Sequence, residues 1–369
     1  MSRSPVWVAD VERFSSNLRA FAAAWRAEWP RTRLVYSYKT NRLVDFLHAA
    51  ELAGAGAEVV CEVEYELAIG VVETDPRKIV VDGPAKPDAL LARAGAGGAL
   101  VLADSVDELP RAAAHGVRRV GLRVALESFT GAVTRFGIAP SEIADAARAA
   151  ERLGMTVEAL STHLVSTDFD SATGRIVVNW PRAAAEHARA AALLADLARG
   201  LRADGHPVAT LDLGGGVPGA PAVAPHAREV AAALRSGGFA GTLLLEPGRA
   251  LVADAVDLVF TVVAVKTLSD GSRCVVCDAG TNFLPGALTA PPLIEALEAG
   301  GPVSPALVTG PLCLNVDVIH PRAQLPILGP GARLVARSVG AYQQVAATQF
   351  GEAPPPVVVR SHAEQPISV

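Results

Sequence analysis

The sequence contains no uninterrupted apolar run long enough to span a bilayer and no run of lysines and arginines. The first absence argues against a transmembrane segment, and the second argues against a basic surface for nucleic acid. Residues 1–5 are polar, and no apolar segment of the signal-peptide type follows them. We therefore expect a cytoplasmic protein that binds neither membranes nor nucleic acid.

Cysteine is scarce, with four residues in a chain of 369, so a disulfide framework is not expected. Cys274 and Cys277 form a CxxC pair inside a strand-like run, where their side chains would point to opposite faces. A zinc or redox site needs a second pair or a helix N-terminus, and neither is present. We expect both cysteines in the core and no metal site.

Half of the residues are hydrophobic and 19% are charged, with a formal net charge of −5. The length predicts two domains, or one large domain with an extension, and the composition predicts a large core. Up to Arg249, short apolar runs alternate with loops and alanine-rich helical segments. The candidate strands are residues 34–38, 57–60, 78–82, 99–103, 120–125, 157–163, 209–213 and 241–245.

This alternation predicts an α/β fold with a parallel sheet, and eight strands favour a closed (β/α)8 barrel over an open doubly wound sheet. After Arg249 the apolar runs are joined by glycine and proline turns, which predicts a mostly antiparallel β domain. We expect the barrel at residues 26–249. We expect the β domain at residues 1–25 and 250–369, joined by a strand at residues 6–9.

Lys39 follows the first barrel strand, and the next lysine in the chain is Lys78. Partial burial of an amine disfavours its ammonium form, lowers its pKa and makes it nucleophilic. Such lysines form Schiff bases with carbonyl compounds, including pyridoxal phosphate. Taken alone, a surface lysine that caps a strand is the commoner case.

Functional residues of such barrels come from the C-terminal ends of the strands. Residues 214–216 are glycines whose N–H groups could cradle a phosphate, although a tight turn would also use them. Glu246 could hold a pyridine nitrogen protonated and Arg249 could bind phosphate, unless they form a salt bridge with each other. The other polar strand ends are Glu58, Asp82, Asp104, Arg123 and His163.

Four further residues are candidates with a structural alternative each. His163 could lie on an aromatic cofactor ring and Ser166 could bind phosphate, although a lone histidine is more often a core residue. Cys313 could donate a proton, although a buried inert cysteine is commoner. The phenol of Tyr342 could reach a phosphate, or it could be a core or interface residue.

Together, these residues make the chain resemble the fold type III pyridoxal-phosphate-dependent decarboxylases, the family of diaminopimelate, ornithine and arginine decarboxylases. The resemblance covers residues 5–359, and its motifs occur in the family's order. It is carried by residues 36–41, 56–64 and 83–86, His163 with Ser166, residues 214–216, Glu246 with Arg249, and residues 278–280, 310–317 and 340–342.

The resemblance implies an alanine-racemase-like barrel and a homodimer with shared active sites. It implies that Lys39 carries pyridoxal 5'-phosphate as an aldimine, that Glu246 protonates the ring and that His163 stacks on it. Loss of the α-carboxylate as CO2 would give a quinonoid, which the partner subunit's Cys313 or a water would reprotonate. The other implied cofactor-binding residues are Glu58, Arg123, Ser166, Gly214, Gly215, Gly216, Arg249 and Tyr342.

The implied substrate-binding residues are Cys313, Leu314 and Asp317. Diaminopimelate enzymes usually carry a glutamate at the position of Leu314, and ornithine-type enzymes carry an aspartate there. Residues 281–288 also lack the arginine that holds a distal carboxylate in diaminopimelate enzymes. We therefore expect a modified or carrier-protein-linked amino acid, in a specialised pathway of the siderophore or antibiotic type.

Three alternatives remain open. The first is a diaminopimelate decarboxylase of lysine biosynthesis. The second is a racemase or epimerase on the same fold, against which Glu246 argues because those enzymes often place an arginine at the pyridine nitrogen. The third is a non-catalytic binding protein, against which the presence of Lys39, the three glycines and Cys313 argues.

Overall fold

The computed structural model describes residues 4–126, 134–164, 167–170, 175–178, 180–297 and 301–360. They fall into two units. One unit holds residues between Asn17 and Ala250, and the other holds the chain up to Ser16, residues within Asp168–Val177, and the chain from Leu251 onwards. The first division lies inside helix α1, earlier than the expected boundary at residue 26.

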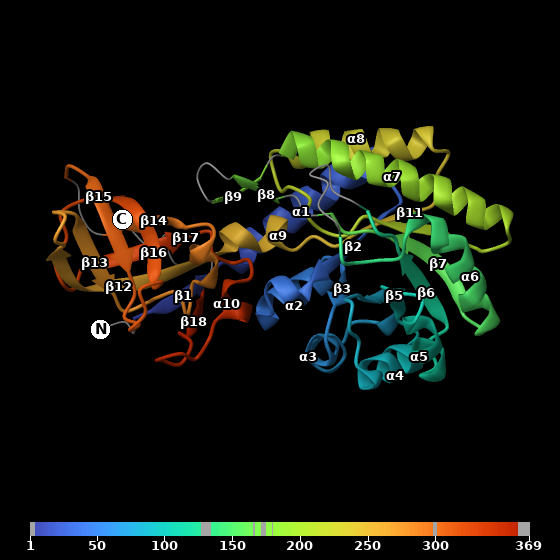
Figure 1. Cartoon of the computed structure of the whole chain (residues 1–369), viewed down its shortest axis with the longest axis horizontal. Coiled ribbons are helices and arrows are strands. Elements are labelled where there is room, and N and C mark those ends of the chain that lie inside the picture. The colour runs from blue at the N-terminus through green and yellow to red at the C-terminus, as the bar shows by residue number, and fades with distance from the viewer. Residues whose placement is uncertain are drawn as a thin grey trace. The chain divides into compact units, whose positions relative to one another are not determined.

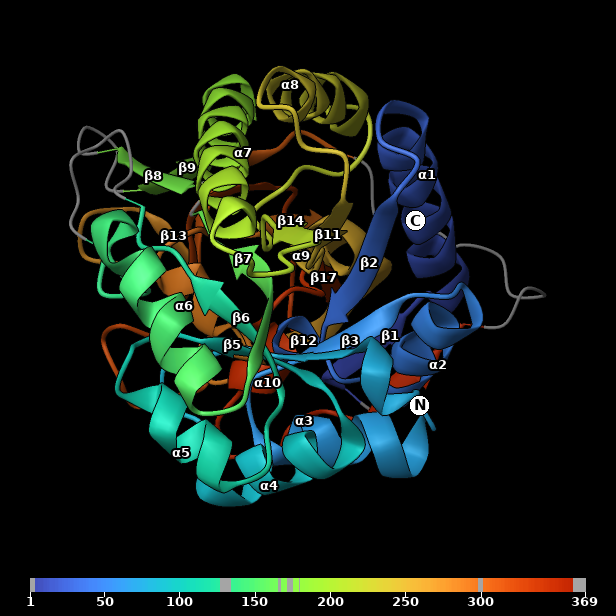
Figure 2. The same ribbon diagram turned by 90° about the vertical axis from the view of Figure 1, so that its right-hand side faces the viewer.

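Eight parallel strands close a barrel in the first unit, so the expected (β/α)8 architecture is confirmed and the open sheet is excluded (Figure 2). The strand order is β2-β3-β4-β5-β6-β7-β10-β11, and β11 returns to β2 through the pair Leu245 and Leu34. The strands are β2 (Thr32–Ser37), β3 (Gly56–Val59), β4 (Ile79–Val81), β5 (Leu100–Ala103), β6 (Arg119–Arg123), β7 (Thr156–Ser161), β10 (Thr210–Asp212) and β11 (Thr242–Leu245).

Helices surround these strands (Figure 2). In α6, Ile143, Ala146, Ala147 and Ala150 are buried at helical spacing, which explains why an alanine-rich sequence forms an amphipathic helix here. No helix in the described ranges combines the length and apolar character needed to cross a membrane. The helices are α1 (Val11–Glu28), α2 (Val44–Leu52), α3 (Glu62–Glu66), α4 (Asp88–Gly97), α5 (Glu108–Ala114), α6 (Ile143–Arg152), α7 (Trp180–Ala203), α8 (Val223–Ser236) and α9 (Arg249–Val252).

The interior of the barrel is a packed core. Buried side chains from five strands form one hydrophobic cluster, which leaves the strand ends as the place for polar chemistry. The cluster consists of Val35, Val80, Leu100, Leu102, Ala159 and Leu244.

The second unit contains a mostly antiparallel sheet in the order β14-β17-β12-β13-β15-β16, in which β1 pairs with β12 and with β18 (Figure 1). The expected β domain is confirmed, and its sheet includes the N-terminal strand β1. Strand β14 and the two-stranded sheet β8-β9 were not expected. The elements are β1 (Val6–Ala9), β8 (Thr167–Asp170), β9 (Arg175–Val178), β12 (Val256–Thr267), β13 (Arg273–Cys277), β14 (Leu293–Ala296), β15 (Ser304–Thr309), β16 (Val318–Leu325), β17 (Arg333–Arg337), β18 (Val357–Val359) and helix α10 (Gln343–Ala346).

The CxxC pair lies in β13 of this sheet. Cys274 and Cys277 are both buried and neither forms a disulfide. Their expected place in the core is confirmed.

The barrel depends on a close approach at Gly56, the first residue of β3. A Cβ atom on this residue would lie 2.1 Å from the carbonyl oxygen of Lys78. We predict that Gly56→Ala lowers the free energy of unfolding by about 1–3 kcal/mol, because the backbone must move. Gly200→Ala, in an open position of α7, is the matched control and should be neutral or slightly stabilising. Urea unfolding followed by circular dichroism measures both, and equal effects would contradict the prediction.

Candidate active site

Lys39 lies at the C-terminal end of the barrel. Strand β2 ends at Ser37, and Lys39 follows in a 3-10 turn, Tyr38–Thr40. Its Nζ donates a hydrogen bond to Glu58 Oε1 over 2.5 Å, and the Glu58 side chain is fully buried. The register of β2 and β3 pairs Ser37 with Glu58, so the two adjacent strand ends bring amine and carboxylate together.

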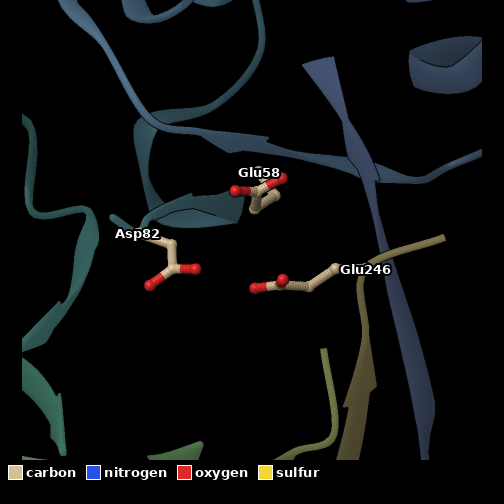
Figure 3. A group of neighbouring side chains, drawn as sticks. All are labelled: Glu58, Asp82 and Glu246. Atoms are coloured by element: carbon tan, nitrogen blue, oxygen red, sulfur yellow. The ribbon is translucent and has the colours of Figure 1, made fainter. Parts of the chain in front are cut away.

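Three buried carboxylates converge at this end of the barrel (Figure 3), and their charges act on Lys39. Glu58 comes from β3, Asp82 follows β4 and Glu246 follows β11, and one oxygen atom of each lies within 4.8 Å of the others. Parallel strands place their carboxyl ends at one end of the barrel, which explains how residues far apart in sequence meet here. The site is therefore rich in negative charge.

This charge overturns the expectation that Lys39 has a lowered pKa. Burial lowers the pKa of the amine, but the negative charges of Glu58, Glu246 and Asp82 together raise it above the ordinary lysine value. Burial also raises the pKa of Glu58 to about 7, against the opposing effect of Lys39. Lys39 is thus held as an ammonium ion, and it becomes nucleophilic only when the surrounding negative charge is offset.

Arg123 is the second cation of the cluster. Its Nη1 lies 3.4 Å from Asp82 and 3.3 Å from Asp104, and its guanidinium group lies over the ring of Phe136. Burial raises the pKa of Asp82, but Arg123 and the nearby lysines outweigh it and the net change is downwards. Arg123, expected to bind cofactor, thus holds the two aspartates at the ends of β4 and β5.

A buried ion pair supports these same strand ends. Lys86 Nζ donates to both oxygens of Glu108, at 2.9 and 3.0 Å, and to the carbonyl of Gly83. Glu108 Oε2 in turn accepts from the backbone N–H of Asp104. The Lys86–Glu108 pair therefore fixes the loops that carry Asp82 and Asp104, and no spacing pattern in the sequence indicated it.

The glycine loop packs against His163. Gly214 and Gly216 have φ angles of 65° and 72°, a region that strongly favours glycine. A Cβ atom on Gly214 would lie 2.7 Å from His163 Nδ1. The N–H of Gly215 donates to that same nitrogen over 3.2 Å, and Glu246 Oε2 lies 3.6 Å from it. Glycines, histidine and glutamate therefore form one contiguous group.

Asp212 also belongs to this group, although no role was predicted for it. Its Oδ1 accepts from the N–H of Gly214 over 2.8 Å. Burial, followed by the negative charge of Glu246, raises the pKa of Asp212, so its protonated form is favoured. Only its place at the end of β10, directly before the glycines, could have indicated a role.

The remaining predicted site residues are Arg249, Ser166 and four residues of the second unit. Arg249 begins α9 and is exposed, and Ser166 lies outside the described residues. Cys313, Leu314 and Tyr342 are exposed residues of the second unit. Asp317, in the same unit, is buried, and its oxygens accept hydrogen bonds from Thr281 and from the N–H of Leu312.

The site fits a ligand that carries a cationic N–H group. Oε2 of Glu58 and Oε1 of Glu246 are buried without a hydrogen-bond partner among the described residues. Unpartnered buried carboxylate oxygens are costly, so they mark where a ligand completes the structure. Glu58 pairs with Lys39 and Asp82 with Arg123, whereas Glu246 pairs with no lysine or arginine in the described ranges. A protonated pyridine nitrogen suits this carboxylate.

Comparison with known proteins decides the family. The model of the pyridoxal binding domain of pyridoxal-dependent decarboxylases matches residues 15–253. The chain belongs to this family. The decarboxylase is 28% identical over 373 residues to chloroplastic ornithine decarboxylase from Nicotiana glutinosa, covering 94% of this chain and 82% of that one. It is also 28% identical over 378 residues to diaminopimelate decarboxylase from Deinococcus radiodurans, covering 96% and 89%.

The decarboxylase also shares its whole fold with a solved structure. The crystal structure of Helicobacter pylori diaminopimelate decarboxylase complexed with L-lysine superposes with a TM-score of 0.87 at 22% identity, covering 100% of this chain and 94% of that one. The chain is therefore a pyridoxal-phosphate-dependent amino-acid decarboxylase, a carboxy-lyase, and pyridoxal 5'-phosphate is its cofactor.

The charge cluster predicts how Lys39 titrates. In the cofactor-free protein, Glu58→Gln should lower the pKa of Lys39 by about 1–3 units, because a neighbouring opposite charge is lost. Acetylation by acetic anhydride across a pH series, quantified by mass spectrometry, measures this shift. Lys78, whose partner is Glu51, is the internal control and should not change. An unchanged midpoint for Lys39 would contradict the electrostatic account.

The buried Lys86–Glu108 pair predicts a strongly non-additive effect on stability. Lys86→Met should lower the free energy of unfolding by about 3–5 kcal/mol, because it leaves Glu108 charged and buried. Lys86→Met combined with Glu108→Leu should recover much of this loss. Arg148→Ala, which removes an exposed ion pair of α6, is the control and should have little effect. Additive losses in urea unfolding would refute the prediction.

Proposed function

We propose that the decarboxylase removes the α-carboxylate of an amino acid or amino-acid derivative at the C-terminal end of the barrel. Lys39 is the residue that we assign to covalent attachment of the cofactor. The observation that carries this assignment is the group of buried carboxylates around Lys39, in which Glu246 keeps one oxygen without a hydrogen-bond partner among the described residues. We therefore propose catalytic and cofactor-binding roles for the residues at the C-terminal end of the barrel.

Pyridoxal phosphate supplies an electron sink for the electron pair left when CO2 departs. Glu246 would accept the N–H of the pyridine nitrogen and would keep that nitrogen protonated. Because a cation there offsets the carboxylate charge around Lys39, the same interaction favours the neutral, nucleophilic amine. His163, whose Nδ1 accepts from Gly215, presents its ring as the stacking surface.

The phosphate group is assigned to the glycine loop. The N–H groups of residues 214–216 suit an anion because the three glycines let the backbone approach it closely. Arg249, Ser166 and Tyr342 are proposed as further phosphate ligands from the family resemblance. Glu58 and Arg123 are proposed to hold the electrostatic environment of the ring through Lys39 and Asp82.

We propose a homodimer in which Cys313 of the partner subunit, or a water, returns a proton to Cα. The exposure of Cys313 and Leu314 supports this, since both side chains are available to a second copy. Asp317 is proposed to act from the same loop, whose backbone it holds at Leu312.

The distal end of the substrate is proposed to be uncharged or masked. Leu314 offers no carboxylate for a distal amine, and residues 281–288 offer no arginine for a distal carboxylate. A modified or carrier-linked amino acid of a specialised pathway fits these substitutions. The alternative is a diaminopimelate decarboxylase, which the similarity to diaminopimelate decarboxylases favours. The similarity to ornithine decarboxylases is equally high, so sequence identity does not identify the substrate.

The test is CO2 release by the cofactor-loaded protein. We expect faster release from Nε-acetyl-lysine or Nδ-acetyl-ornithine than from free lysine, ornithine, arginine or meso-diaminopimelate, because Leu314 cannot pair with a distal charge. Lys39→Ala is the inactive control. Faster release from a free amino acid would assign the enzyme to primary metabolism. Deuterium uptake at Cα without CO2 release would point to a racemase.

A further inference from the structure

The peptide groups of Gly215 are held between two histidines. Its N–H donates to His163 Nδ1, and its carbonyl oxygen lies 3.2 Å from Nε2 of His187. His163 follows β7, whereas His187 lies in α7 and is fully buried. The glycine loop is thus attached on one side to the proposed cofactor face and on the other side to the helix behind it.

The hydrogen of neutral His187 is best placed on Nε2, where it serves a carbonyl that has no other donor among the described residues. Both ring nitrogens face carbonyl oxygens: Nε2 faces that of Gly215, and Nδ1 lies 2.8 Å from that of Ala183. A neutral imidazole carries only one N–H, so it can donate to only one of the two. Burial lowers the pKa of His187 and so favours the neutral ring. The Ala183 carbonyl lies four residues before His187 in α7 and already accepts its backbone N–H. The Gly215 carbonyl receives no other hydrogen bond from described residues.

The contact with His187 matters because the glycines of this loop can adopt more than one backbone conformation. Gly214 and Gly216 both have positive φ, and glycine lets peptide groups rotate at low cost. In a trans peptide, the carbonyl of Gly215 and the N–H of Gly216 point in opposite directions. Fixing that carbonyl against α7 therefore aims the N–H of Gly216 away from α7.

We propose that His187 is a positioning residue that orients the glycine loop, and with it the N–H of Gly216, for the phosphate group of the cofactor. This inference rests on the proposed phosphate role of residues 214–216. His187 does not itself contact the ligand; it acts through the carbonyl of Gly215.

His226 of α8 provides a matched control. Its ring centroid lies 4.9 Å from that of His187, and it is equally buried. Neither of its ring nitrogens has a hydrogen-bond partner among the described residues, and burial lowers its pKa to about 3. Substitution of His226 therefore disturbs the same packing without removing a bond to the glycine loop.

The experiment compares His187→Gln with His187→Asn in cofactor-free protein. The glutamine amide occupies the place of Nε2 and can still donate to Gly215, whereas the asparagine amide occupies the place of Nδ1 and cannot. Calorimetry gives the affinities for pyridoxal phosphate and for inorganic phosphate, and thermal unfolding confirms that each variant folds. We expect His187→Asn to weaken both affinities about tenfold, and His187→Gln and His226→Leu to stay within about threefold of the unsubstituted protein.

Three outcomes would overturn the proposal. Equal weakening in His187→Asn and His226→Leu would indicate packing alone. Equal affinities in the glutamine and asparagine variants would show that the hydrogen bond to the Gly215 carbonyl does not affect phosphate binding. Loss of pyridoxal phosphate affinity without loss of phosphate affinity would place the effect at His163 instead. Because none of these measurements needs a substrate, failure of the proposed decarboxylation would leave the comparison of affinities intact.

Discussion

The ion pair between Lys39 and Glu58 is the constraint around which the rest of the site is arranged. A buried carboxylate and an amine at 2.5 Å stabilise each other only while both are charged, yet a lysine that attacks a carbonyl carbon must be neutral. Asp82 and Glu246 reinforce the ammonium form. The structure therefore favours the ammonium form of Lys39, and its proposed role as a nucleophile would require that the surrounding negative charge be offset.

Much of the fold was predictable because it rests on periodicity. The alternation of apolar runs and alanine-rich segments placed all eight barrel strands within a few residues, and glycine and proline turns indicated the β domain. Strand β14 was missed because four residues between loops carry too short an alternation to recognise. The positions of Lys39, Glu58, His163, Glu246 and the three glycines followed from one rule, that barrel chemistry lies at strand ends.

The properties that could not be predicted from the sequence depend on distances between side chains. The sign of the pKa shift of Lys39 is the outcome of opposing effects, burial against three nearby charges, and their balance is set by coordinates. Asp212, His187 and Lys86 were not predicted because each is a buried polar residue without a distinguishing sequence pattern, on a strand, on a helix and in the loop after β4, respectively. Such residues do not touch the proposed ligand, and their importance lies in the backbone groups they hold.

Because β11 and β2 close the barrel, the group of residues around Lys39 can form only after the last barrel strand has been synthesised. Lys39 lies after the first barrel strand and Glu246 after the last, and these strands are neighbours only in the closed ring. During synthesis, the lysine leaves the ribosome some two hundred residues before the glutamate. A nascent or truncated chain thus displays a lysine without its full set of carboxylates. Closure of the ring therefore completes the group of carboxylates around Lys39.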